Sequence, residues 1–265
     1  MQLAFQKMQG AGNQILVVDQ RNAVGVAPSL QLVRQIHGRD GCAGFDQLMW
    51  LGPPRTAGAA ASYRVFNNDG SEVEQCGNGV RCVAVWLARQ NDAPARFLFD
   101  SPAGRIEARI IGANRAAVNM GAPVFDDSIG TLEVAGQQID VSVLSMGNPH
   151  CVLDVADVRS ADVAGLGPVI ERHALFPDRC NVGFMQIVDR SNIMLRVFER
   201  GAGETLACGT GACAAVAAGR RRGLLDDEVT VQLPGGQLVV SWRGGNEAIW
   251  LTGDAELISE GTIDL

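Results

Sequence analysis

Two Cys-Gly-Xaa-Gly tetrapeptides, at residues 76–79 and 208–211, are the most reactive pattern in the chain. Each precedes a segment rich in Ala, Val and Arg, and we expect helices over about 78–90 and 210–222. A cysteine at a helix start lies where unpaired N–H groups and the helix dipole favour a thiolate. The following glycines let backbone amides approach an anion such as a carboxylate. Each tetrapeptide therefore predicts a reactive thiol beside an anion site.

The two tetrapeptides belong to a longer internal repeat. Residues 64–79, RVFNNDGSEVEQCGNG, align without a gap with residues 196–211, RVFERGAGETLACGTG, at an offset of about half the chain. A duplicated half-chain predicts an α/β fold of two pseudo-symmetric domains, with a boundary near residues 121–123. Two copies related by a pseudo-twofold axis would bring their equivalent loops together across an inter-domain cleft.

Two equivalent thiols suit the inversion of a stereocentre. One group removes the Cα proton from one face while the other delivers a proton to the opposite face. Cys76 and Cys208 would then alternate as thiolate and thiol and titrate as a coupled pair. Helix N-termini aimed at the substrate carboxylate would stabilise the carbanion more than the ground state. We therefore predict an amino-acid racemase or epimerase whose scheme needs no pyridoxal phosphate or other cofactor.

Short β-rich stretches recur along the chain and make strands the dominant element. A further helix is expected from Leu30 to His37, with Ser29 as N-cap and Gly38 ending the last turn. The clearest strand candidates are residues 15–18, 47–51, 105–111, 141–144 and 237–242.

Composition excludes several classes of protein. The 265 residues are 47% hydrophobic, yet no apolar run approaches the eighteen or so residues that cross a bilayer. The first residues lack the pattern of an export signal. A net charge of -7 argues against a nucleic-acid partner. The seven cysteines, an odd number in a chain of this size, favour a reducing cytoplasm. We expect a cytoplasmic enzyme that binds a small polar substrate and neither nucleic acid nor membrane.

The remaining cysteines and the histidines do not predict a metal site. The sequence has no Cys-x-x-Cys pair, and His37, His150 and His173 are scattered. The other cysteines are interpreted as buried small apolar residues, a common environment for this residue type. They are Cys42, Cys82, Cys151, Cys180 and Cys213.

With both cysteine motifs identified, the chain resembles the diaminopimelate epimerase family over nearly its full length. The specific stretches are residues 66–79, FNNDGSEVEQCGNG; 145–150, SMGNPH; 181–186, NVGFMQ; and 199–211, ERGAGETLACGTG. The resemblance implies interconversion of LL- and meso-2,6-diaminopimelate, in lysine and peptidoglycan-precursor biosynthesis, without pyridoxal phosphate. It also implies two α/β domains, each a curved mixed sheet around a central helix. The predicted domains are 1–121 and 122–253, with a final strand, 254–265, returning to the first.

The resemblance assigns roles residue by residue. Cys76 and Cys208 are the acid/base thiols, and His150 and Glu199 bias the protonation of those thiols. Ser259 stands where many members carry a tyrosine associated with dimer formation, so the homodimer is the least supported implication. Cys180 replaces a usual apolar residue and places an extra thiol near the pocket. The implied substrate-binding residues are Asn13, Gln47, Asn67, Gly77, Asn78, Asn148, Asn181, Glu199, Arg200, Gly209 and Thr210.

Other interpretations of these residues stay open. The four asparagines at 13, 67, 148 and 181 lie within two residues of a Gly, Asp or Pro, where turns commonly use Asn. The same two-thiol scaffold would serve a racemase of proline, 4-hydroxyproline or histidine. Glu199 and Arg200, which replace Asn67 and Asn68 of the first repeat, favour a substrate with a second carboxylate. A carboxylate-binding protein would need the glycines but not two thiols, and a cysteine hydrolase would need a base beside one cysteine.

Overall fold

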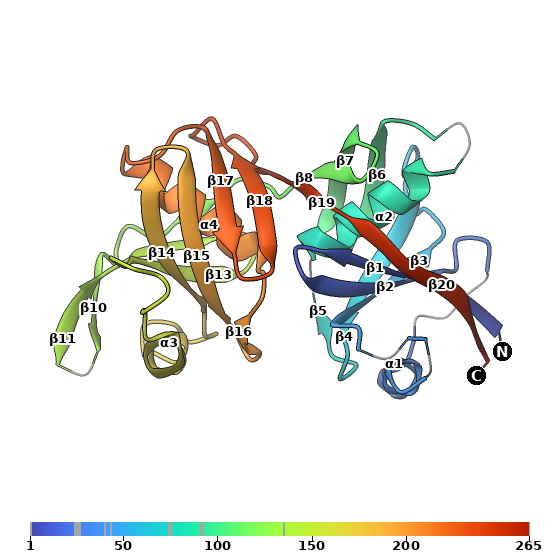
Figure 1. The fold of residues 1–265 in the computed structure, drawn as a ribbon, viewed down its shortest axis with the longest axis horizontal. Coiled ribbons are helices and arrows are strands. Elements are labelled where there is room, and N and C mark those ends of the chain that lie inside the picture. Colours follow the sequence, from blue (N-terminus) through green and yellow to red (C-terminus); the bar gives the residue numbers. More distant parts are fainter. Residues whose placement is uncertain are drawn as a thin grey trace. The chain divides into compact units, whose positions relative to one another are not determined.

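The computed structural model describes residues 2–23, 28–39, 41–42, 44–73, 76–90, 93–134 and 136–264. By its internal contacts the chain divides into two compact units: unit 1 comprises Met1–Asn119 and Gly253–Leu265, and unit 2 comprises Met120–Thr252. Both units combine a mixed β-sheet with few helices, as the predicted α/β class requires (Figure 1). Of the last predicted strand, 254–265, Leu265 lies outside the described residues.

Unit 1 is a mixed sheet with a helix on each side. Strand β1 pairs antiparallel with β2 and β20, β2 runs parallel to β3, and β4 is antiparallel to β3 and parallel to β6. Strands β6, β7 and β8 form an antiparallel meander. The elements are β1 (Gln2–Gly10), β2 (Asn13–Asp19), α1 (Leu30–His37), β3 (Gln47–Gly52), β4 (Ala61–Asn67), β5 (Glu72–Val73), α2 (Gly77–Ala88), β6 (Arg96–Ser101), β7 (Gly104–Gly112), β8 (Arg115–Asn119) and β20 (Glu256–Asp264).

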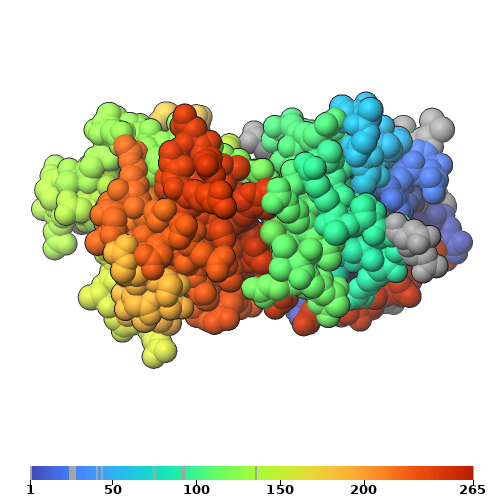
Figure 2. All heavy atoms as spheres, turned by 90° about the horizontal axis from the view of Figure 1, so that it is seen from above, coloured from blue at the N-terminus to red at the C-terminus, as the bar shows by residue number. Residues whose placement is uncertain are grey.

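The C-terminal strand completes unit 1. Strand β20 extends alongside β1 from Gln2↔Asp264 to Gln9↔Glu256, with an irregularity between Lys7 and Met8. In Figure 2 the red spheres of this segment lie beside the green and teal spheres of unit 1. The two ends of the chain therefore belong to one sheet.

Unit 2 repeats the order of unit 1. Strand β13 runs parallel to β14, β15 is antiparallel to β14 and parallel to β17, and β17 to β19 form a meander, as β2 to β8 do in unit 1. The elements are β9 (Val124–Phe125), β10 (Thr131–Val134), β11 (Gln137–Asp140), β12 (Ser142–Ser145), β13 (Pro149–Asp154), α3 (Val163–Glu171), β14 (Asn181–Asp189), β15 (Asn192–Glu199), β16 (Gly203–Thr205), α4 (Gly209–Arg221), β17 (Glu228–Leu233), β18 (Gly236–Ser241) and β19 (Trp250–Asp254), whose last residues belong to unit 1.

Each unit contains a central helix that begins at a repeated cysteine. Helix α2 packs against β1, β2, β7 and β8, and α4 packs against β12, β13, β14 and β18. Ten residues of α2, Gly77 to Val85 and Leu87, are buried, and so are the residues from Gly211 to Gly219 in α4. Small Ala, Gly and Val side chains allow this close approach to the strands. The two helices predicted after the cysteines are confirmed, and each begins one residue earlier than expected.

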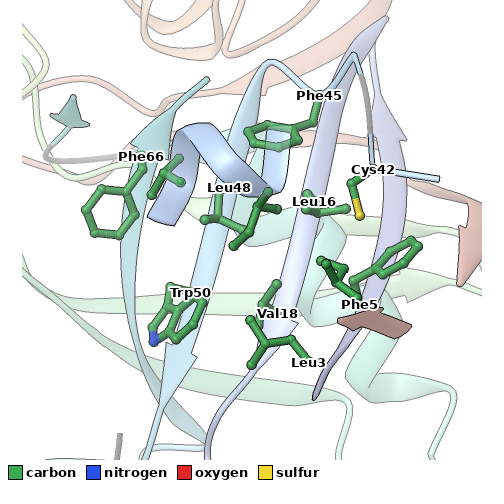
Figure 3. Close-up of a cluster of buried hydrophobic side chains, with 12 residues drawn as sticks. Leu3, Phe5, Leu16, Val18, Cys42, Phe45, Leu48, Trp50 and Phe66 are labelled. Atoms are coloured by element: carbon green, nitrogen blue, oxygen red, sulfur yellow. The ribbon is translucent and has the colours of Figure 1, made fainter. Parts of the chain in front are cut away.

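Helix α1 covers a second apolar layer of unit 1. It has the predicted bounds: Ser29 accepts a hydrogen bond from the N–H of Leu32, and Gly38 is the C-cap. Its Val33 and Ile36 join a buried cluster with side chains from β1, β2, β3 and β4, including Leu16, Leu48 and Trp50 (Figure 3). Burying this many apolar side chains is the main stabilising contribution to the layer.

A hairpin precedes each repeated cysteine and carries the same ion pair. In unit 1, Arg64 binds Glu72 through both carboxylate oxygens; in unit 2, Arg196 binds Glu204 in the same way. These are repeated residues, and they join β4 to β5 and β15 to β16. A bidentate Arg–carboxylate pair fixes the relative orientation of the two strands that it joins. The hairpin before each cysteine therefore has a defined geometry.

Candidate active site

Cys76 and Cys208 are the N-cap residues of α2 and α4. Both have extended backbones, with φ of -141° and -119°, and both side chains turn back over the first helical turn. The Cys76 Sγ accepts from the N–H of Gly79 at 3.1 Å, and the Cys208 Sγ accepts from the N–H of Gly211 at 3.4 Å. Each sulfur occupies the place usually taken by a Ser or Asp oxygen at a helix start. The repeat thus gives two thiols the same backbone environment.

Packing requires the second glycine of each tetrapeptide. A Cβ on Gly79 would lie 2.5 Å from the Met49 sulfur, and a Cβ on Gly211 would lie 3.0 Å from a Val197 methyl carbon. Both would also approach the neighbouring cysteine Sγ to 3.3 Å. A side chain at either position would displace the thiol it follows.

In unit 1, Asn13 and Asn78 form a polar contact next to Cys76. The Nδ2 of Asn78 lies 3.5 Å from the Oδ1 of Asn13, and the Nδ2 of Asn13 donates to Asp46 at 3.0 Å. The Asn78 Oδ1 accepts from the buried Arg81 guanidinium at 2.8 Å. These contacts fix the amide orientations of two predicted substrate-binding residues.

Gln47 and Asn67 form a second polar pair in unit 1. They face each other across β3 and β4, and the Gln47 Nε2 donates to the Asn67 Oδ1 at 3.3 Å. The Asn67 amide also donates to Ser71. Within the described ranges, no hydrogen bond links this pair to Asn13 or Asn78, so the predicted residues of unit 1 form two groups.

In unit 2, Asn148 connects His150 to the first turn of α4. The Nδ2 of Asn148 lies 3.4 Å from the Thr210 hydroxyl, and its Oδ1 lies 3.0 Å from the Nε2 of His150. The same Thr210 hydroxyl is 3.5 Å from the Cys208 sulfur. Four predicted residues are therefore joined through consecutive contacts.

Asn181 holds the turn that carries Glu199 and Arg200. Its Oδ1 accepts from the backbone N–H of Arg200 at 3.0 Å, and its Nδ2 donates to the carbonyl of Pro149. The Arg200 guanidinium donates to the carbonyl of Asp178 at 3.3 Å. The Glu199 carboxylate accepts from the Thr205 hydroxyl at 2.5 Å.

Burial governs the electrostatics of the unit 2 group. It raises the pKa of Cys208 well above its usual range, and the charge of the nearby Glu199 acts in the same direction. The hydrogen bonds from Thr210 and Gly211 oppose this rise in pKa. Burial also raises the pKa of Glu199. The helix-dipole argument predicts a stabilised thiolate, whereas at Cys208 burial outweighs the dipole and favours the thiol.

His150 is neutral at physiological pH. Burial lowers the pKa of its imidazole to about 3, and the positive charge of Arg200 adds to the effect. A neutral ring whose Nε2 carries the proton donates to the Asn148 Oδ1, which leaves the Asn148 amide directed at Thr210. The neutral His150 ring therefore fixes the orientation of the Asn148 side chain by donating a hydrogen bond to it.

The other thiols lie in apolar packing. Cys42, Cys82, Cys151, Cys180 and Cys213 are all 0% exposed, which confirms their interpretation as buried apolar residues. Cys180 belongs to the apolar cluster under α3, and burial raises its pKa to about 12. It follows that the Cys180 side chain points into the core of unit 2. Within the described ranges, no three His, Cys, Asp or Glu side chains form a group able to hold a metal ion.

The sequence does not predict several residues that position the site. Arg81, Asp46 and Thr205 each bond a predicted site residue, and Glu171 bonds the backbone of Gly201, which follows Arg200. Arg81 lies one helical turn after Asn78, and this spacing is the one feature of the sequence that indicates a contact between them. The others come from segments far from, or irregularly spaced to, the residues they hold.

Comparison with solved structures supports a shared fold. A probable proline racemase from Agrobacterium radiobacter K84 has a TM-score of 0.76 at 15% identity, with 99% of this chain and 93% of that chain covered. A PhzF-family phenazine biosynthesis protein from Bacillus anthracis has a TM-score of 0.77 at 15% identity, with both chains fully covered. This fold, with a cysteine capping the central helix of each unit, and the match to a family of epimerases together define an isomerase of the racemase and epimerase class.

The chain belongs to the diaminopimelate epimerase family. The family model matches residues 5–125 and 142–258. Diaminopimelate epimerases from Laribacter hongkongensis and Alkalilimnicola ehrlichii are 48% and 46% identical to it, with 100% of each chain covered. Among the described residues, no helix is both long and apolar enough to cross a membrane.

Proposed function

We propose that the chain interconverts LL- and meso-2,6-diaminopimelate by proton transfer between Cys76 and Cys208 through one Cα. The observation that carries this proposal is the repeated cap: both sulfurs accept from the amide three residues ahead, at the start of equivalent helices. Two identical acid/base groups are what inversion of one carbon requires. Membership of the diaminopimelate epimerase family supports the choice of substrate.

The proposed step conserves protons. The Cys76 thiolate takes the Cα proton of one stereoisomer, and the Cys208 thiol gives its proton to the opposite face of the same carbon. Cys76 ends as a thiol and Cys208 as a thiolate, ready for the reverse reaction. The raised pKa of Cys208 supports its starting role as the proton donor. Charge that develops on the substrate carboxylate would be stabilised by the N–H groups that open α2 and α4.

The difference between the two repeats supports a substrate with a second charged end. Glu199 and Arg200 of unit 2 stand where unit 1 has Asn67 and Asn68. We propose that Arg200 binds the distal carboxylate of diaminopimelate, because a guanidinium can pair with both of its oxygens. The substrate would also contact polar groups of both units: Asn13, Gln47, Asn67, Asn78, Asn148 and Asn181 with the amides at Gly77, Gly209 and Thr210.

Solvent exchange tests the proposal directly. Purified protein, cleared of small molecules, is incubated with LL-diaminopimelate in heavy water and followed by NMR. We expect deuterium at one Cα and formation of the meso isomer. Cys76→Ala and Cys208→Ala should each abolish formation of the meso isomer. Cys213→Ala is the matched control, because it removes a buried thiol from the same helix as Cys208 but away from its N-terminus.

The outcomes separate chemistry from specificity. If the protein labels proline, hydroxyproline or histidine instead, the two-thiol step stands and the assigned substrate is wrong. Formation of the meso isomer by either cysteine variant would contradict a two-base mechanism. Exchange that needs added pyridoxal phosphate would contradict the cofactor-independent scheme.

We also propose a cytoplasmic homodimer. All seven cysteines are buried thiols, which suits a reducing compartment. The dimer is carried over from the family despite Ser259. Light scattering during gel filtration tests it, and a mass of one chain would overturn it.

A further inference from the structure

Glu171, the last residue of α3, is a buried carboxylate outside the predicted site. Its side chain is 2% exposed, and its Oε1 accepts from the backbone N–H of Gly201 at 2.8 Å. A carboxylate is buried at a cost that must be offset by specific partners. The Oε2 of Glu171 lies 3.4 Å from the Nε of Arg172, and Gly201 belongs to the turn that follows Glu199, the last residue of β15.

The turn is held at two consecutive amides. The N–H of Arg200 donates to the Asn181 side chain at 3.0 Å, and the next N–H, of Gly201, donates to Glu171. Gly201 has a φ of +77°, a conformation that glycine adopts readily. The two acceptors therefore define the direction in which the Arg200 side chain leaves the backbone.

Glu171 also contacts the segment that receives the Arg200 guanidinium. Its Oε1 lies 3.8 Å from the Nη1 of Arg179, a residue with a φ of +59°. The preceding residue, Asp178, accepts from the Arg200 guanidinium through its carbonyl at 3.3 Å. Glu171 thus contacts both the turn that contains Arg200 and the segment that binds the Arg200 guanidinium.

Unit 1 holds its equivalent turn in another way. The N–H of Asn68, the repeat equivalent of Arg200, donates to the backbone carbonyl of Asp46 at 3.2 Å. At this amide unit 1 therefore uses a backbone acceptor, whereas unit 2 uses the Asn181 side chain. The side-chain acceptor occurs in the unit whose turn carries Glu199 and Arg200.

We propose that Glu171 is a positioning residue for substrate recognition. The Glu171 carboxylate fixes the peptide group between Arg200 and Gly201. The Arg200 side chain then points toward the distal carboxylate of the substrate. This inference rests on the proposed function of Arg200. It concerns binding of the non-reacting end of the substrate, and it leaves proton transfer at Cα to the two thiols.

The test compares Glu171→Leu with Glu171→Gln. Leu removes the acceptor of the Gly201 N–H, whereas Gln keeps an oxygen for it. We expect Glu171→Leu to raise the KM for LL-diaminopimelate about tenfold with a kcat within about threefold of wild type, a pattern of lost binding. Glu171→Gln should restore a KM within about threefold of wild type, because the hydrogen bond rather than the charge is needed.

Asp162→Ala provides the control for helix stability. Asp162 caps the other end of α3 by accepting from the N–H of Gly165 at 2.9 Å. It should lower the melting temperature and leave KM unchanged. Glu171→Leu with a wild-type KM, or with a KM change matched by Asp162→Ala, would overturn the proposal. If wild-type protein fails to exchange the Cα proton of any substrate, the proposed function itself fails, a result distinct from these.

Discussion

The side-chain amide of Asn148 lies 3.4 Å from the Thr210 hydroxyl, and Asn13 lies 3.5 Å from Asn78 at the equivalent place in the other unit. In both cases an asparagine at the start of a strand contacts the second residue after the capping cysteine. The two units therefore build the same contact with different side chains. Thr210 has the additional property of lying 3.5 Å from the Cys208 sulfur.

Thr210→Val should raise the pKa of Cys208. The hydroxyl lowers that pKa by hydrogen bonding to the sulfur, and valine keeps the shape while removing the bond. The measurement is the pH dependence of alkylation at Cys208, followed by mass spectrometry in a Cys76→Ala background. Thr210→Ser keeps a hydroxyl and should leave the pKa close to that of the parent protein. An unchanged profile in Thr210→Val would show that the hydroxyl does not act on the thiol.

Glu199→Gln should move the same pKa in the opposite direction. The Glu199 charge raises the pKa of Cys208, so a neutral amide of nearly equal size removes part of that rise. Burial, the larger cause, remains, and the pKa should stay above its usual range. Alkylation of Cys208 should therefore begin at lower pH than in the parent. A shift to higher pH would contradict the assigned role of the carboxylate.

Gly211→Ala should reduce turnover by displacing the thiol. The new Cβ would lie 3.2 Å from the Cys208 Cβ and 3.3 Å from its Sγ, with Val197 at 3.0 Å on the other side. We expect kcat to fall between about tenfold and a hundredfold, as small misplacements of reacting groups commonly produce. Steady-state kinetics of the epimerisation check this value.

Gly219→Ala is the control within the same helix. Its Cβ would meet the Leu225 side chain at 2.5 Å, so we expect a loss of stability of about 1–3 kcal/mol from overpacking. Activity per folded molecule should be retained. If both variants lose activity in proportion to their stability, the position of the thiol is not the cause.

Local signals in the sequence were sufficient for the elements that present the thiols. Helix α1 has the bounds that Ser29 and Gly38 predict, and the Cys-Gly-Xaa-Gly tetrapeptides place the starts of α2 and α4 to within a residue. These features depend on neighbours a few residues apart. Helix α3 was missed because Gly165, Gly167 and Pro168 interrupt a short helical pattern, although Asp162 supplies a cap.

Long-range contacts account for what the sequence could not predict. The bonds from Gly201 to Glu171 and from Arg200 to Asn181 join residues about 20 to 30 positions apart, and no periodic pattern relates them. Burial is equally non-local: the dipole at the start of α4 can be read from the sequence, but the desolvation that raises the pKa of Cys208 requires the packed core. The roles assigned to the site residues stay predictions for the exchange experiments.

His150 should make the folded protein less stable as the pH falls below 6.5. The unfolded chain binds a proton at the ordinary pKa of 6.5, whereas the folded chain holds the ring neutral down to about 3. Between these values the unfolded state binds more protons, so stability decreases by about 1.4 kcal/mol for each pH unit of acidification. Above 6.5 the full contribution is present. Urea unfolding of wild type and His150→Gln on the acid side of 6.5 measures the difference, with His173→Gln as the control. Parallel curves for wild type and His150→Gln would show that the buried ring does not cause the acid sensitivity.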